Sequence, residues 1–149
     1  MKKLWHAALP AAILFLTAAA LPAAEKKLMH CFYFTPIEGA SQADWDAFHK
    51  ATEALPKKIP GLTRVWHGTL LRPFMQFNTD AETRKKLQGG EQKATGPVTA
   101  RTRTHGVCME MDNEAALKVY AGHPAHKEWE TLYGKVRQPG TMTFDIVGH

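Results

Sequence analysis

The sequence predicts an α+β fold in which a four-stranded antiparallel sheet carries two helices on one face. Three observations lead to this class. Short runs rich in aromatic and β-branched residues alternate with longer runs whose apolar residues recur at helical spacing. These runs follow the order β-α-β twice, with a weakly patterned segment between the two halves. Proline and glycine residues separate most of the runs, as turns require.

Four segments are predicted to be strands, at residues 28–35, 62–70, 104–111 and 141–147. The first ends at Pro36, which has no N–H to donate to a sheet hydrogen bond. Both faces of these strands carry apolar residues, so we expect both faces of the sheet to be covered.

Three helices are predicted around these strands. The first covers residues 41–55, because Ser41 and Asp44 resemble a capping box and Pro56 favours an end. The other two cover residues 114–120 and 125–133, with Asp112-Asn113 as the cap of the former. Gly122-His123-Pro124 separates them, and Pro124 suits the first position of the new helix.

Residues 71–103 have the weakest pattern. A short polar helix is predicted near residues 79–87, and Gly89-Gly90 and Gly96-Pro97 indicate loop. We predict a long insertion loop here, which forms a lid, an arm or a flexible excursion. With this insertion set aside, the element order is the ferredoxin-like βαββαβ arrangement.

Residues 1–24 are predicted to be a secretory signal peptide. Lys2 and Lys3 precede an apolar run, and small residues follow it. The run is too short for a comfortable transmembrane span, so no stable span is expected after cleavage near Ala23 or Ala24. We therefore expect an exported protein, periplasmic or secreted, whose single domain covers residues 28–147.

Composition excludes one class of partner. The formal net charge of +5 falls to +3 without Lys2 and Lys3, and the basic residues are scattered, so no nucleic-acid partner is expected. Cys31 and Cys108 lie in predicted strands of a chain bound for an oxidising compartment. A cross-strand disulfide between them is one possibility. Because the geometry of such a bond is restrictive, we expect two buried free thiols instead.

Helices on one face leave the other face of the predicted sheet bare, although its residues are apolar. Such a face has to be covered, and a second copy of the chain is the simplest cover. The sequence therefore predicts a homodimer through the open sheet face.

The candidate site centres on residues 120–126, which read Tyr-Ala-Gly-His-Pro-Ala-His. The break between the two helices should point Tyr120, His123 and His126 toward a common region. Tyrosine and histidine are suited to moving protons near neutral pH. The alternative is a helix corner whose polar groups are simply satisfied by hydrogen bonds.

Several residues in order resemble the stress-responsive A/B barrel (Dabb) family, a branch of the dimeric α/β barrel superfamily. They are His30, the Ile59-Pro60-Gly61 turn, Tyr120, the His123-Pro124-Ala125-His126 corner and Asp145. The resemblance covers residues 29–146, with 71–103 as an insertion. It implies a dimeric α/β barrel with a small-molecule pocket.

A plant polyketide cyclase of this family uses a Tyr and a His as its acid–base pair, without metal or organic cofactor. The resemblance implies catalytic roles for Tyr120 and His126, and no cofactor or metal is expected. The substrate-contacting residues that it implies are His30, Val107, His123 and Trp129.

The pocket walls depart from that cyclase. His49 and Thr52 replace aromatic residues, and Thr143 replaces an aliphatic one, so the implied pocket is more polar.

Three functions remain open. The first is an exported, dimeric protein that binds a small ligand and whose histidines are structural. The second is a cofactor-free acid–base enzyme of cyclase or isomerase type, with His126 as general base and Tyr120 as its acid partner. The third is a monooxygenase, as found elsewhere in the superfamily. A metal site at His123 and His126 is disfavoured, because no carboxylate accompanies the pair.

Overall fold

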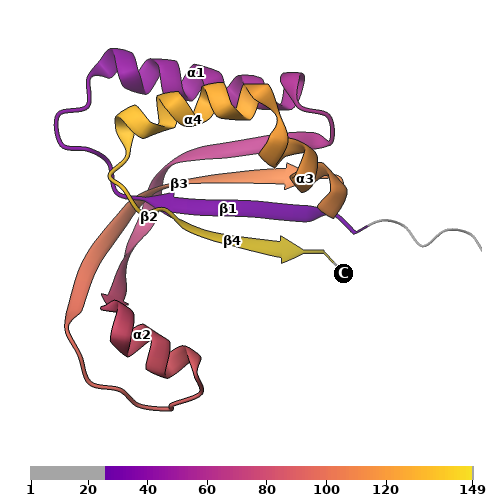
Figure 1. Cartoon of the computed structure of the whole chain (residues 1–149). Coiled ribbons are helices and arrows are strands. Elements are labelled where there is room, and N and C mark those ends of the chain that lie inside the picture. Colours follow the sequence, from indigo (N-terminus) through magenta and orange to yellow (C-terminus); the bar gives the residue numbers. More distant parts are fainter. Residues whose placement is uncertain (1–25, 149) are drawn as a thin grey trace, which may run out of the picture.

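The computed structural model describes residues 26–148, so the predicted signal peptide lies outside the described residues. The elements in chain order are β1 (Leu28–Phe34), α1 (Gln42–Lys58), β2 (Leu62–Thr79), α2 (Ala81–Gln88), β3 (Val98–Met111), α3 (Glu114–Gly122), α4 (Pro124–Val136) and β4 (Met142–Val147). The strands form one antiparallel sheet in the order β2-β3-β1-β4. Helices α1, α3 and α4 lie on one side of it (Figure 1). The predicted ferredoxin-like fold is confirmed.

The first helix starts where the capping residues predict and ends later than expected. Ser41 is the N-cap, and its hydroxyl accepts from the Asp44 N–H at 3.1 Å. The helix then runs through Pro56 to Lys58. Proline is tolerated here because it lies in the last turn, where its missing N–H removes a single hydrogen bond. The Ile59 N–H, bonded to the Leu55 carbonyl at 2.9 Å, closes the helix.

Residues 71–103 are not a long loop, and this part of the sequence-based prediction is wrong. β2 continues to Thr79 and β3 begins at Val98, with the register shifting between Thr69 and Phe74. We call residues 70–103 the arm. It extends on the side of the sheet away from α1 and α4 and ends in α2 (Figure 1). Both strand faces lie mostly outside the core here, so the apolar alternation that signals a strand is weak.

Cys31 and Cys108 form a disulfide, and the expectation of two free thiols is wrong. The two residues stand directly opposite each other in the β1–β3 register, with their Cα atoms 4.1 Å apart. Closely spaced antiparallel pairs bring the side chains within bonding reach. A cross-strand disulfide requires two cysteines that face each other. The β1–β3 register, which composition alone does not give, provides this arrangement.

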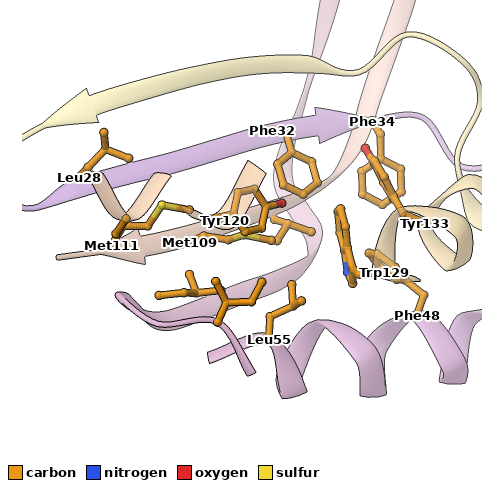
Figure 2. Packing of buried hydrophobic residues seen from close by; sticks show 14 of the residues in the cluster. Leu28, Phe32, Phe34, Phe48, Leu55, Met109, Met111, Tyr120, Trp129 and Tyr133 are labelled. Atoms are coloured by element: carbon orange, nitrogen blue, oxygen red, sulfur yellow. The ribbon is translucent and has the colours of Figure 1, made fainter. Parts of the chain in front are cut away.

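The main core fills the space between the sheet and the helices (Figure 2). Phe32 and Phe34 of β1 pack against Phe48 of α1 and against Trp129 and Tyr133 of α4. The candidate site described below lies beside these aromatic rings.

The opposite sheet face is apolar and partly exposed. Tyr33 packs against Phe74 of the arm and Phe144 of β4, with ring centres 5.1 and 5.4 Å apart. Trp66 and Ile146 remain 44% and 55% exposed. No helix among residues 26–148 has the length and apolar character needed to cross a bilayer.

Candidate functional site

One residue joins the two helices of the corner. His123 is the C-cap of α3, where its N–H donates to the Tyr120 carbonyl at 3.1 Å. It is also the N-cap of α4, where its Nδ1 accepts from the Ala125 N–H at 3.1 Å. Pro124 occupies the first helical position, as predicted. This joint brings the Tyr120 and His126 rings to a centroid separation of 4.1 Å.

A cavity of about 350 Å³ lies next to this corner, between α3, α4 and the strands β1 and β4. Four of the predicted site residues line it: Tyr120, His126, His30 and Trp129. The other lining residues are Phe32, Leu117, Ala121, Glu130, Tyr133, Arg137, Thr141 and Thr143.

Two predicted substrate-contacting residues lie outside this lining. Val107 is 1% exposed and belongs to the core of the sheet. The His123 side chain is taken up by the capping bond to the Ala125 N–H. Of the residues predicted to make the pocket more polar, some line the cavity and others do not. Thr143 lines the cavity, whereas Thr52 lies behind Trp129 and accepts from its indole N–H at 2.8 Å.

His49, the third polar replacement, also lies away from the cavity. Its ring stacks on His67 of β2, with ring centres 4.9 Å apart. Because His49 lies against β2 and does not line the cavity, it does not make the cavity more polar.

Tyr120 remains protonated at neutral pH. Its side chain is almost fully buried. Burial, with a smaller contribution from the Glu130 charge, raises the pKa of its hydroxyl well above the usual value of 10.0. No other described residue forms a hydrogen bond with this hydroxyl, so its proton is available to a ligand in the cavity.

His126 is predominantly neutral at pH 7. Burial lowers the pKa of its imidazole below the usual 6.5, and this outweighs the opposing effect of Glu130, whose Oε1 lies 3.9 Å from Nε2. Nδ1 is buried and has no hydrogen-bond partner among the described residues. A neutral imidazole carries its proton on one ring nitrogen only, and in the tautomer with the proton on Nδ1 the lone pair of Nε2 can act as a base.

His30 is oriented by a carboxylate that the sequence-based site did not include. Its Nδ1 lies 2.6 Å from Oδ1 of Asp145. A carboxylate only accepts, so Nδ1 donates and Nε2 is left for the cavity side. The two residues stand directly opposite in the β1–β4 register, and pairing these two strands would have found the contact.

Three further lining residues that the sequence-based site did not include come from α4 and the residue that follows it. Glu130, Tyr133 and Arg137 continue from His126 at intervals of three or four residues, which places them on one side of the helix. The helical spacing from His126 is the sequence signal that indicates this face. No group of three or more metal-ligating side chains with suitable geometry occurs among residues 26–148.

The sequence matches no protein-family model and no curated protein. Solved structures, by contrast, share its fold. A Dabb family protein with a ferredoxin-like fold from Mesorhizobium loti is 15% identical, with a TM-score of 0.53 over 84% of this chain and 99% of that chain. A hydroxynitrile lyase from Passiflora edulis is 14% identical, with a TM-score of 0.56 over 85% and 96%.

A third similar structure is a dimeric protein of unknown function with a ferredoxin-like fold from Bacteroides fragilis. It is 19% identical, with a TM-score of 0.53 over 81% of this chain and 95% of that chain. At these identities the similarity concerns the fold alone. The chain thus has the ferredoxin-like fold that a Dabb family protein also has, and the predicted resemblance to that family is confirmed at the level of the fold.

Proposed function

We propose that this chain transfers a proton at a carbon next to a carbonyl group of a small molecule, using side chains alone. The observation that carries the proposal is the Tyr120–His126 pair. A protonated phenol and a neutral imidazole lie 4.1 Å apart, centre to centre, and line the same cavity. This is the protonation state that acid–base catalysis at a carbonyl requires at neutral pH.

The reaction starts with His126 as base. Its Nε2 lone pair takes a proton from the carbon, so the C–H bond breaks and an N–H bond forms. The electron pair of that bond moves into the carbonyl group, which becomes an enolate. The Tyr120 hydroxyl donates a hydrogen bond to the developing enolate oxygen and stabilises its charge. In an isomerase-type reaction His126 then returns the proton to carbon. In a lyase-type reaction the electron pair of the enolate re-forms the carbonyl group and breaks the bond to a leaving group, which takes the proton from His126.

His30 positions the substrate in this scheme. Asp145 fixes the orientation of its imidazole, and its ring lies 5.6 Å from that of Tyr120. The second ring nitrogen can then bind a polar group of the substrate beside the Tyr120 hydroxyl. The hydroxynitrile lyase of similar fold supports a lyase-type reaction, because it indicates that this fold can hold such chemistry.

Deuterium exchange tests the proposal without a known substrate. A panel of small methyl ketones and β-keto acids is incubated with the protein in D₂O, and loss of the C–H signal is followed by NMR. We expect faster exchange with the wild-type chain than in buffer. The variants His126→Gln and Tyr120→Phe should lose about 10²-fold or more of this rate.

His49→Gln is the matched control, because it removes an imidazole outside the cavity. It should exchange as the wild type does. Equal rates for the wild type and both site variants would overturn the proposal and favour a ligand-binding role.

We further propose that the protein is exported and acts as a homodimer through its open sheet face. The disulfide supports export, because such bonds persist in oxidising compartments. The exposed apolar residues of that face and the dimeric proteins of similar fold support the dimer.

A further inference from the structure

The end of the cavity away from Tyr120 and His126 carries an arginine without a carboxylate partner. Arg137 follows α4 and lines the cavity. Its buried Nε has no hydrogen-bond partner, and none of the ion pairs among residues 26–148 includes it. Its one side-chain hydrogen bond within that range runs from Nη1 to the Gln138 carbonyl, at a long 3.4 Å. The two N–H groups of Nη2 and the second N–H of Nη1 have no partner among the described residues and are left for a ligand.

The helix C-terminus alone does not explain where the Arg137 guanidinium lies. An arginine at a helix C-terminus meets the negative end of the helix dipole, and an exposed side chain satisfies that preference. Here the backbone is held by a bridge to Pro36 and by a bond from the Arg137 N–H to the Tyr133 carbonyl at 3.2 Å. The side chain folds back, so that its Cζ lies 4.7 Å from the centre of the Tyr133 ring.

A second arginine without a carboxylate partner, Arg103, does not line the cavity, but its charge acts on Tyr133 at this end. Arg103 is 2% exposed, its Nη1 has no partner, and its other nitrogens donate to the neutral Gln76 amide at 3.0 and 2.7 Å. Burial raises the pKa of Tyr133 to about 12, and both arginines, together with a hydrogen bond to Thr141, act against that rise. The Tyr133 hydroxyl thus lies within the field of two uncompensated positive charges.

Stacked rings connect this end to the base. His126 stacks on Trp129 at 5.8 Å and 18°, and Trp129 stacks on Tyr133 at 4.9 Å and 19°. The Arg137 guanidinium covers the far end of this stack. Glu130, the acidic residue among those that line the cavity, is 3.9 Å from His126 and so lies at the opposite end. The cavity therefore has a proton acceptor at one end and a cation at the other.

We propose that Arg137 binds a carboxylate of the substrate. The ligand class is an elongated aryl or alkyl acid whose carbonyl group lies at the end opposite the carboxylate. The flat apolar middle of such a molecule would lie along Trp129 and Tyr133. The position of the carbonyl end rests on the proposed proton-transfer function, whereas the anion site rests on Arg137 and its surroundings.

The probe 4-acetylbenzoate tests both parts, because one flat ring separates its carboxylate from an enolisable methyl ketone. Its uncharged counterpart is 4-acetylbenzamide. We expect calorimetric titration of the chain to give roughly tenfold or more tighter binding of the acid than of the amide, as a charge-assisted hydrogen bond provides. This preference should disappear in Arg137→Gln and persist in Arg64→Gln, which removes an arginine of β2 that stacks on Trp66 instead.

The outcomes separate the two proposals. Equal affinity for the acid and the amide, or a preference that survives in folded Arg137→Gln, overturns the anion site. If Arg137→Gln does not fold, Arg137→Lys keeps a charge and should retain part of the preference. His126→Gln should keep the preference for the acid and lose deuterium exchange at its methyl group. A preference for the acid without any exchange in the wild type supports the anion site and overturns the proton-transfer function.

Discussion

His30 and Asp145 form a 2.6 Å contact between the two strands β1 and β4, with the imidazole partly buried and the carboxylate 42% exposed. The contact fixes which ring nitrogen of His30 carries the proton. It also ties the C-terminal strand to the wall of the cavity, because His30 lines that wall.

Replacement of Asp145 should change the His30 tautomer. In Asp145→Ala the Nδ1–H loses its acceptor, so the neutral ring should shift toward the Nε2–H form. Asp145→Asn keeps a carbonyl acceptor and should retain the Nδ1–H form. Ring ¹⁵N chemical shifts of His30 report the tautomer directly. Identical shifts in the wild type and in Asp145→Ala would show that the contact does not set the proton position.

Stability should fall on acidification through the histidine range. Burial lowers the pKa of His126 below its unfolded value of 6.5, and burial with the His49 charge does the same for His105. As the pH falls below 6.5 the unfolded chain takes up these protons first, so the folded state is destabilised, and the loss levels off below the folded pKa values. Urea midpoints between pH 7.5 and 5 measure the effect.

The variants His126→Gln and His105→Gln should each flatten this pH dependence in part. His123→Gln is a useful comparison, because it removes a histidine of the same corner that caps α4. A midpoint that rises as the pH falls would contradict the assignment of neutral buried imidazoles.

Loss of the Cys31–Cys108 disulfide should destabilise the chain by about 2–4 kcal/mol, since the bond closes a long loop in the unfolded state. The two cysteines are 77 residues apart in the sequence. Urea unfolding of Cys31→Ala/Cys108→Ala measures the change. The wild type treated with a phosphine reductant should unfold near the midpoint of that variant. Coincident curves for the oxidised and reduced wild type would mean that the bond adds no stability.

A charge on the open sheet face should prevent dimer formation. Ile146 is 55% exposed on β4, and Ile146→Glu places a carboxylate on that apolar surface. Sedimentation velocity should give a dimer for the wild type and a monomer for this variant. Val119→Glu is the matched control, because Val119 is 46% exposed on α3 in the helical layer. A wild type that sediments as a monomer at high concentration would rule out this interface.

Local sequence signals predicted most of the fold. Ser41 with Asp44, Asn113 and Pro124 each mark a helix start through interactions within four residues, and each lies where the sequence places it. The arm and the disulfide required strand register, which depends on contacts between distant segments. No local signal near Cys31 reveals that Cys108 stands opposite it.

The candidate site likewise contains residues that local sequence signals bring together and residues that only long-range contacts bring together. Tyr120 and His126 are six residues apart and joined by one capped corner, so sequence reasoning could bring them together. Arg137 owes its position to a bridge with Pro36, a residue that is far away in the sequence. Asp145 likewise meets His30 through the pairing of the two strands that lie farthest apart in the chain.

The double cap at His123 has a consequence for how such a protein can change. A short contiguous stretch of chain holds the phenol and the imidazole in place, whereas the groups proposed to select a substrate come from separate elements. Point changes at Arg137 or Thr143 can therefore alter which molecule is held while leaving the proton donor and acceptor undisturbed. Under the proposed function, reactivity and selectivity are encoded in different places, and a lineage with this corner can acquire new substrates one residue at a time.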